Sequence, residues 1–414
     1  MALIGQTSIA MSDEFYRIKR LPPYVIAEVN TLRHAARQSG RDIIDLGMGN
    51  PDLPPPPHVI AKLCEVAAKP DAHGYSQSKG IPGLRRAQAN YYARRFGVEV
   101  DPEREVVVTM GSKEGLASLA TAITAPGDVV LAPNPSYPIH TFGFIIAGAT
   151  IRSVPTTPDE AYFRSLERAM AFTVPRPSIL VVNYPSNPTA ETVDLAFYER
   201  LVAWGRDNKV WIVSDLAYSE LYYDGHPTVS ILQVPGAKEI AIEFTSLSKT
   251  FSMAGWRIGF AVGNPQLIAA MTRVKSYLDY GAFTPIQAAA CAALNGPQDI
   301  VETNRQLYHK RRDVLVEVFG RAGWDIPPPR ASMFAWAPLP PALAHMGSLE
   351  FSKQMLEHAD VAVAPGVGYG EDGEGFVRIA LVENEQRLRQ AARNVKRWLQ
   401  AKGVNAPGGA RQAD

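Results

Sequence analysis

The chain has 414 residues, of which 46% are hydrophobic and 20% charged, an ordinary balance for a globular protein with a large core. This length allows two or three domains. Lysines and arginines total 42 against 41 acids, giving a net charge of +1 without basic runs, which argues against a nucleic-acid partner or a polybasic membrane-binding surface.

Cys64 and Cys291 are the two cysteines, and so few thiols predict neither a disulfide framework nor a zinc cluster. No His, Cys or carboxylate spacing predicts a metal site, and no Walker or Gly-x-Gly-x-x-Gly run predicts a nucleotide site. Residues 1–11 do not resemble a signal peptide, and the longest apolar run, 143–151, falls short of the ~18 residues of a membrane helix. We therefore expect no metal, no membrane span and a cytoplasmic location.

In chain order, short apolar runs alternate with longer helical patterns. The expected strands are 105–109, 128–132, 178–183, 210–214, 240–244 and 257–262. The expected helices are 112–124, 195–208, 266–278, about 298–321 and about 385–402. Strands that are apolar throughout and separated by helices indicate an α/β fold with a mostly parallel sheet that is covered on both faces.

After residue 297 the pattern changes to a long helix, short strands and a final helix, which indicates a smaller α+β domain. Proline clusters at 54–57 and 327–329 mark a crossing between domains and a loop. We predict an N-terminal arm and part of the small domain over 1–52, a large domain over 53–297, a small domain over 298–403 and a flexible tail over 404–414. Residues 1–13 are also expected to be mobile.

Polar residues cluster where the predicted strands end. Asn187, Asp215 with Tyr218, and Ser246 with Lys249 each follow a different strand, and Gly111-Ser112 opens a helix after another. Ligands of open parallel sheets bind beyond the carboxyl ends of the strands. We therefore expect these distant segments to converge on one crevice.

Lys249 lies among small and apolar residues in the string 245–259, Thr-Ser-Leu-Ser-Lys-Thr-Phe-Ser-Met-Ala-Gly-Trp-Arg-Ile-Gly. Desolvation there disfavours the ammonium form, as an amine nucleophile requires. Ser246 and Arg257 bracket the lysine and offer hydroxyl and guanidinium donors to a phosphate. A surface lysine in a loop is the alternative for an isolated Ser-x-Ser-Lys, but the whole string with Arg257 at its offset favours the catalytic interpretation.

With this string the chain resembles the class I/II aminotransferases that depend on pyridoxal 5'-phosphate (PLP), which have the fold type I architecture. The resemblance covers residues 14–402 and is strongest to the bacterial glutamate–pyruvate (alanine) aminotransferases. The motifs behind it are the segments 20–25, 42–52, 73–76, 111–115, 134–140, 185–190, 215–218 and 275–281. Residue 190 is Ala where the family usually has Gly, which affects only the following turn.

The resemblance implies a role for each matching residue around the cofactor ring. Lys249 would bind the cofactor covalently and move the substrate proton, and Asp215 would pair with the pyridine nitrogen. Asn187 and Tyr218 would donate to the phenolic oxygen, and Tyr137 would stack on the ring. Taken alone, Asp215 would be interpreted as a helix cap and Tyr137 as a core tyrosine.

The phosphate and the substrate carboxylate have their own predicted residues. For the phosphate the resemblance implies the following group: Gly111, Ser112, Lys113, Ser246, Ser248, Arg257 and, from the partner subunit of a homodimer, Tyr75. Arg378 would hold the substrate α-carboxylate, helped by Gly49 and Asn187. The alternative for Arg378 is a solvent-facing arginine on an edge strand. Arg17, Arg20 and Arg33 are open candidates for a substrate side-chain carboxylate.

The resemblance implies amino-group transfer, with L-alanine and 2-oxoglutarate giving pyruvate and L-glutamate. Aspartate, methionine, branched-chain or aromatic substrates remain alternatives. A C–S lyase, decarboxylase or synthase on the same scaffold would have the same cofactor residues. A regulatory protein that retains the domain would need an added DNA-binding segment, and this chain has neither the spare length nor the basic patch.

Overall fold

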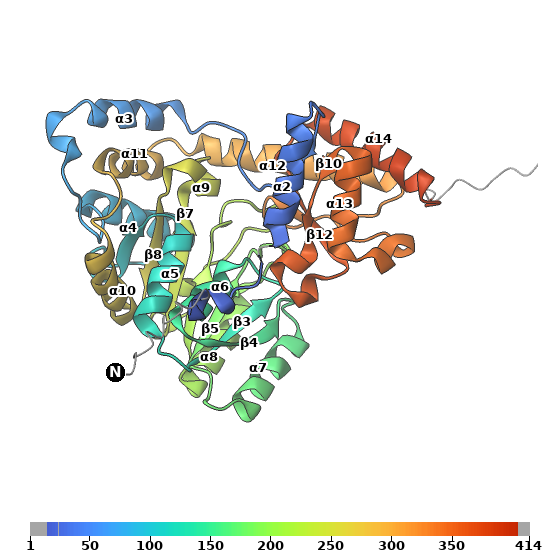
Figure 1. Cartoon of the computed structure of the whole chain (residues 1–414). Helices are drawn as coiled ribbons and strands as arrows, with labels where there is room; N and C mark the ends of the chain where they lie inside the picture. Colours follow the sequence, from blue (N-terminus) through green and yellow to red (C-terminus); the bar gives the residue numbers. More distant parts are fainter. Residues whose placement is uncertain (1–14, 24, 405–414) are drawn as a thin grey trace, which may run out of the picture.

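The computed structural model describes residues 15–23 and 25–404, so the predictions made for residues 1–13 and 405–414 lie outside it. Its larger part is built on a seven-stranded sheet in the order β2-β8-β7-β6-β5-β3-β4 (Figure 1). The strands are β2 (Val106–Thr109), β3 (Val129–Asn134), β4 (Thr150–Pro155), β5 (Ile179–Asn183), β6 (Trp211–Asp215), β7 (Ala241–Ser246) and β8 (Gly259–Gly263).

Strands β4, β3, β5, β6 and β7 are parallel, whereas β8 is antiparallel to both β7 and β2. This confirms the predicted α/β fold with a mostly parallel sheet. Strand β4 was not predicted, because it is an edge strand on which Thr150, Arg152 and Ser153 are exposed. The apolar run 143–151 divides between this strand and the preceding helix, α6.

Both faces of the large sheet are buried because alternate strand residues enter different cores. Val130, Val181 and Val213 pack with residues of one helical layer. Leu131 and Ile212 pack with the opposite layer. The first layer holds α5 (Ser112–Ile123), α6 (Ile139–Ala147) and α10 (Pro265–Leu278), and the second holds α4 (Pro82–Phe96), α7 (Glu160–Phe172) and α8 (Leu195–Asn208). Helices α3 (Pro57–Ala67) and α11 (Thr284–Asn295) pack on each other beside α4.

The smaller part has its own core, to which the segment around Ile44 and Leu46 contributes together with residues beyond 308. Its sheets are the antiparallel β11-β12-β9 and the parallel pair β1-β10. The strands are β1 (Ile44–Asp45), β9 (Phe334–Pro338), β10 (Val361–Ala362), β11 (Ala364–Pro365) and β12 (Phe376–Ala380). The helices around them are α2 (Val25–Gln38), α13 (Gly347–Ala359) and α14 (Glu385–Ala401). The short helix α1 (Tyr16–Lys19) is followed by Arg20, which donates to the Ala149 carbonyl just after the end of α6 in the larger part.

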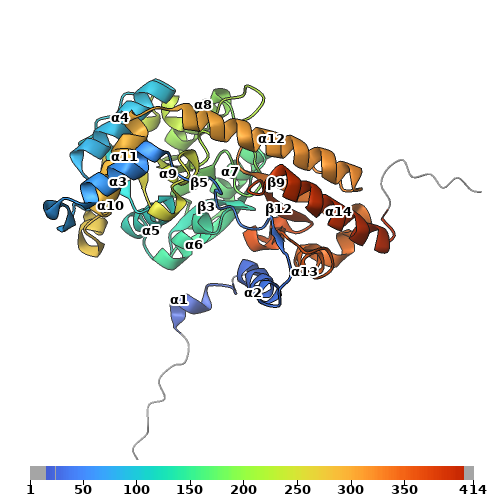
Figure 2. The same cartoon turned by 90° about the horizontal axis from the view of Figure 1, so that it is seen from above.

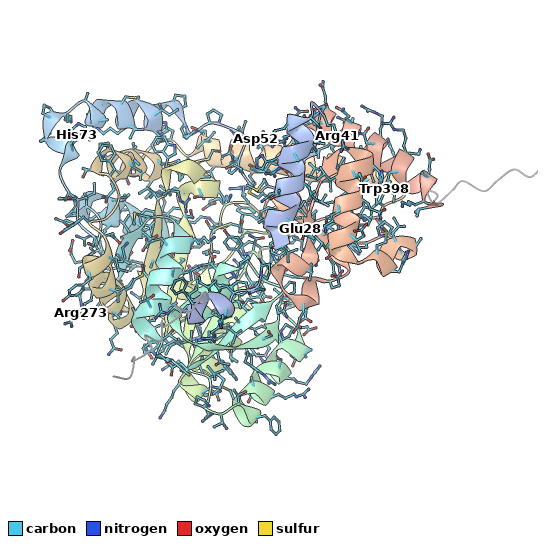
Figure 3. The ribbon with its side chains drawn as sticks, in the orientation of Figure 1. Glu28, Arg41, Asp52, His73, Arg273 and Trp398 are labelled. Atoms are coloured by element: carbon cyan, nitrogen blue, oxygen red, sulfur yellow. The ribbon has the colours of Figure 1, made fainter. Side chains whose placement is uncertain are left out.

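Helix α12 (Asp299–Arg321) joins the two parts and runs across the molecule in Figure 2. Val301, near its start, belongs to the larger core, whereas Leu315 and Phe319 belong to the smaller one. His73 and Trp398 lie at opposite sides of the molecule (Figure 3). Among the described helices, none is long and apolar enough to cross a membrane.

Candidate active site

A cavity of about 590 Å³ lies at the carboxyl ends of β5, β6 and β7, where the two parts of the molecule meet. It gathers most of the residues that the sequence predicted for one crevice. The predicted residues that line it are Gly49, Ser112, Lys113, Tyr137, Asn187, Asp215, Tyr218, Ser246, Ser248, Lys249, Arg257 and Arg378. Gly111 lies directly against Arg257, whereas Tyr75 is not among the lining residues.

Lys249 enters the cavity from α9 (Leu247–Thr250), the single helical turn that follows β7. Its Nζ donates a hydrogen bond to the Gly49 carbonyl at 2.6 Å. Burial, followed by the positive charges of Arg378 and Arg257, lowers its pKa from 10.5 to about 8. The amine is therefore neutral in a substantial fraction of molecules near pH 8, as a nucleophile or a proton acceptor must be.

Asp215 is the last residue of β6 and its side chain is buried. One carboxylate oxygen lies 2.8 Å from Nε2 of the fully buried His140, and the other accepts the Ala217 backbone N–H at 3.1 Å. An ionised Asp215 carboxylate would accept this hydrogen bond from Nε2–H of His140. The residues after Asp215 form turns and no helix, so it does not act as a helix cap.

Asn187, Tyr218 and Arg378 form one hydrogen-bonded group. The Asn187 amide donates to the Tyr218 hydroxyl at 3.4 Å and accepts from Arg378 Nη1 at 2.9 Å. The Asn183 side chain accepts the Asn187 backbone N–H at 2.8 Å and donates to the Asp215 carbonyl at 2.8 Å, so it fixes both loops. Burial raises the pKa of Tyr218, so its hydroxyl stays protonated and can donate.

Arg378 is buried in β12, the central strand of its sheet, and is therefore not a solvent-facing edge arginine. Its guanidinium carbon lies 3.9 Å from the Phe334 ring centroid and 4.9 Å from that of Tyr369, and Nη2 donates to the Gly47 carbonyl at 2.9 Å. In the part of the chain that the structure describes, it forms no ion pair, and its buried Nε has no hydrogen-bond partner. A buried guanidinium without a carboxylate can bind an anionic ligand.

The start of α5 and the loop after α9 form a cradle of donors. Gly111 has φ +82°, and a Cβ there would lie 2.1 Å from Nη2 of Arg257, so only glycine permits this approach. Arg257 is held by a 2.7 Å hydrogen bond from Nη1 to the Ala254 carbonyl. The Ser246 hydroxyl accepts the Ser248 N–H at 3.1 Å. The backbone N–H groups at the start of α5, the hydroxyls of Ser246 and Ser248, and the Arg257 guanidinium together fit a phosphate.

Two predicted residues lie at the margin of the site. Tyr137 is partly buried, its ring packs edge-on against His140 at 6.0 Å, and Lys113 Nζ lies 5.8 Å from its centroid. Tyr75 is 88% exposed, and its ring lies 4.6 Å from that of Tyr280. Within this single chain, Tyr75 therefore has no contact with the cavity.

Sequence reasoning missed several lining residues. Asn30, Asn50, Phe334 and Tyr369 also face the cavity. Phe334 and Tyr369 carry an ordinary core pattern, so no local signal separates them from other buried aromatics. Asn183 could have been found, since it is a polar residue at the end of an apolar strand.

Among the described residues, no group of three or more His, Cys, Asp or Glu is arranged to hold a metal ion. The donors in the cavity instead fit a planar, phosphorylated cofactor. The lining combines donors that suit a phosphate, the buried Asp215 carboxylate and an amine with a lowered pKa.

Comparisons with known proteins identify the family. The family model for aminotransferase class I and II matches residues 41–395. AatC of Rhizobium meliloti, named as an aminotransferase without a stated substrate, is 62% identical over 94% of this chain and 96% of its own length. The glutamate-pyruvate aminotransferase AlaC of Escherichia coli is 53% identical over 94% of this chain and 95% of its own length.

Solved structures extend the agreement to the fold. Substrate-bound BacF from Bacillus subtilis superposes with a TM-score of 0.88 at 33% identity, covering 97% of this chain and 100% of BacF. A double mutant of Thermus thermophilus aspartate aminotransferase superposes with a TM-score of 0.86 at 30% identity, covering 94% and 100%. The chain therefore belongs to the class I and II aminotransferases and is a PLP-dependent enzyme that transfers amino groups between amino acids and 2-oxo acids.

Proposed function

We propose that this aminotransferase converts L-alanine and 2-oxoglutarate to pyruvate and L-glutamate. The observation that carries the reaction class is one cavity lined by both Lys249, an amine of lowered pKa, and Arg378, a buried guanidinium that pairs with no carboxylate among the described residues. The name of the Escherichia coli relative, 53% identical over nearly the whole chain, supports the substrate pair.

The residues that line the cavity suit PLP in one orientation. Gly111, Ser112 and Lys113, mainly through their backbone, would hold the phosphate together with Ser246, Ser248 and Arg257. Asp215 would keep the pyridine nitrogen protonated, Asn187 and Tyr218 would bind the phenolic oxygen, and the Tyr137 ring would cover the pyridine face. When bound, the cofactor supplies an electron sink for the electrons of the substrate Cα–H bond.

Lys249 would both attach the cofactor and carry the proton. Its Nζ is neutral in part near pH 8, so it could accept a proton from the substrate Cα, and the resulting ammonium group would donate that proton to C4′ of the cofactor. The carbonyl of Gly49 holds Nζ in the cavity at 2.6 Å. A single amine therefore performs both proton transfers from one position.

Arg378 would bind the substrate α-carboxylate through its planar guanidinium. Asn187, which already accepts from Nη1, fixes the orientation of this group, and the aromatic rings of Phe334 and Tyr369 exclude water around it. The backbone at Gly49 would complete the carboxylate site. The Phe334 ring lies so close that a Cβ at residue 49 would meet it at 2.4 Å.

The side-chain carboxylate of glutamate needs a further donor. Arg20 donates to the Ala149 carbonyl at 2.6 Å and Arg33 pairs with Asp45 at 2.7 Å, so both guanidinium groups are used elsewhere. Arg17 is exposed and does not line the cavity. Lys113 does line it, is exposed and has a long flexible side chain, which suits a pocket that must accept both a carboxylate and a methyl group.

We also propose a homodimer in which Tyr75 reaches the cofactor phosphate of the partner subunit. The rings of Tyr75 and Tyr280 contact each other at a tilt of 33° and are both exposed, and on the adjoining segment Tyr277 is 84% and Leu278 68% exposed. Such an exposed aromatic surface is typical of a subunit interface.

A panel of amino donors against pyruvate and 2-oxoglutarate tests the substrate assignment. We expect the highest kcat/KM with alanine and glutamate, and Lys113→Met should raise KM for 2-oxoglutarate by about tenfold while leaving KM for pyruvate within about twofold. LL-diaminopimelate belongs in the panel, because a Moorella thermoacetica relative of that specificity is 42% identical over 94% of the chain. A preference for any other donor would refute the assignment.

A further inference from the structure

Lys275 of α10 is a fully buried lysine that lies outside the cavity and has no part in the proposed chemistry. Its Nζ is 3.1 and 3.2 Å from the two carboxylate oxygens of Glu114 and 2.8 Å from Oδ2 of Asp279. A buried ammonium is tolerated only when it is paired, and this one is shared by two carboxylates from different elements. The three side chains, which we call the Lys275 cluster, therefore hold those elements together.

Glu114 connects the Lys275 cluster to the phosphate cradle. It lies in the first turn of α5, where one oxygen accepts the Met110 backbone N–H at 2.8 Å and the other accepts the Ser118 hydroxyl at 2.6 Å. Met110 directly precedes Gly111 and Ser112, whose backbone is the proposed phosphate site. The position of the Glu114 carboxylate therefore sets the position of that turn.

Asp279 connects the Lys275 cluster to the segment that carries Tyr75. Its second oxygen accepts the Gly281 N–H at 2.6 Å, and its carbonyl accepts the Ser78 hydroxyl. Gly281 lies so close to Gln77 that a Cβ would meet the Gln77 carbonyl oxygen at 2.2 Å. His73 and Arg273, which precede these segments, are on the same side of the molecule in Figure 3.

We propose that Lys275 is a positioning residue that locks the phosphate-binding turn 110–112 to the Tyr75 segment. In a dimer, each Lys275 cluster then aligns the cradle of its own subunit and the tyrosine that this subunit offers to its partner. The affinity of both sites for the cofactor phosphate depends on it. This inference rests on the proposed cradle and dimer, but it is independent of which amino acid is the substrate.

Titration of the apoenzyme with PLP and with pyridoxal, which lacks the phosphate, tests the proposal. Lys275→Met preserves the side-chain length and removes the charge, and we expect the Kd for PLP to rise at least about tenfold while the Kd for pyridoxal changes less than about twofold. Lys238→Met is the matched control, because it removes an ammonium paired with Glu105 at 3.0 Å at the opposite end of β2. The control should change neither Kd.

Glu114→Gln provides a milder variant if Lys275→Met does not fold, since the amide oxygen can still accept from Met110. The same selective loss of PLP affinity is expected. Tyr75→Phe should weaken PLP binding less in the Lys275→Met background than in the wild type, because the tyrosine is already misplaced. Equal losses for PLP and pyridoxal, unchanged affinities, or additive effects with Tyr75→Phe would each overturn the proposal. The donor panel measures substrate preference, whereas this titration measures cofactor affinity. The proposed substrate and the proposed role of Lys275 can therefore fail independently.

Discussion

The amine of Lys249 is placed where burial and two neighbouring guanidinium groups act in the same direction. All three disfavour its ammonium form, and they lower its pKa from 10.5 to about 8. Arg378 and Arg257 therefore have a second effect besides their proposed binding of substrate and phosphate. They keep the proton acceptor partly deprotonated at neutral pH.

The rate of PLP uptake by the apoenzyme should follow this titration. Because only the neutral amine attacks the aldehyde, the rate is expected to rise with pH, reach half its maximum near pH 8, and level off above it. Arg378→Met removes a positive neighbour, so the midpoint should move to higher pH. Stopped-flow absorbance at a series of pH values measures both midpoints, and a rate that does not change across this range would contradict the expectation.

Asp215→Ala separates the cofactor role from a purely structural one. We expect kcat to fall by about a hundredfold or more, and PLP to be retained less well. The reason is that the pyridine nitrogen of the cofactor would lose the carboxylate that keeps it protonated. Asp194→Ala is the matched control, since Asp194 caps α8 by accepting the Phe197 N–H at 2.9 Å. The control should lose about 1 kcal/mol of stability and keep its activity. Comparable activities for the two variants would show that Asp215 only holds its loop.

Lys249→Ala should abolish transamination while the fold persists.

At the scale of single elements, the backbone at Gly111, where helix α5 begins, lies so close to the Arg257 side chain that no larger residue fits. Gly111→Ala adds a methyl group that would meet the Arg257 guanidinium and also strains a residue at φ +82°. We expect a loss of PLP affinity larger than the loss of stability. Gly127→Ala, at φ +94°, adds a Cβ that would meet no described atom within 4 Å beyond its chain neighbours, so it controls for the strain alone and should leave PLP affinity unchanged. Equilibrium titration with PLP and thermal unfolding distinguish the two effects.

Strand β7 buries an acid, Glu243, that accepts hydrogen bonds from Tyr92, Ser214 and Ser230. Burial raises its pKa from 4.5 to about 7, so between these values the folded protein binds a proton that the unfolded chain does not. The free energy of unfolding should therefore fall as pH rises through this window. Glu243→Gln removes the titration, and its unfolding curve should show a smaller decline from pH 5 to pH 7, measured by denaturant unfolding. Parallel curves would refute the expected contribution of Glu243.

At the scale of the whole molecule, Arg311 ties α12 to the segment between the two parts of the chain. Its guanidinium donates to both oxygens of Asp52, at 2.8 and 2.7 Å, and is itself almost fully buried, whereas Asp52 is 35% exposed. Asp52 is labelled beside this helix in Figure 3.

Asp52→Ala leaves the Arg311 charge without its partner, and we expect about 1 to 3 kcal/mol of destabilisation in chemical unfolding. Glu385→Gln removes the partner of Lys310 on the same helix, and because Lys310 is 68% exposed and stays hydrated, this change should cost less than about 1 kcal/mol. Similar losses for both variants would show that Asp52 is no more than a surface contact.

The fold class and the convergence of polar residues could be predicted because parallel strands deliver their ends to one edge of the sheet. Asn187, Asp215 and Lys249 follow from that rule alone. The aromatic residues beside Arg378 could not be predicted, since Phe334 and Tyr369 come from segments whose approach depends on tertiary packing. Arg20 and Arg33 were open candidates for a substrate group, and only the structure shows that a distant carbonyl and Asp45 already bind them. The roles assigned to the lining residues stay predictions.

Helix α12 has a consequence for motion between the two parts of the molecule. It is continuous over 23 residues, about 34 Å at 1.5 Å per residue, with its beginning in one hydrophobic core and its end in the other. A swing of the smaller part would have to flex this rod instead of rotating about a loose loop. We therefore expect the two parts to move relative to each other only by small elastic bending of this helix. Such bending reverses by itself, so the walls of the cavity should return to the same spacing after each turnover.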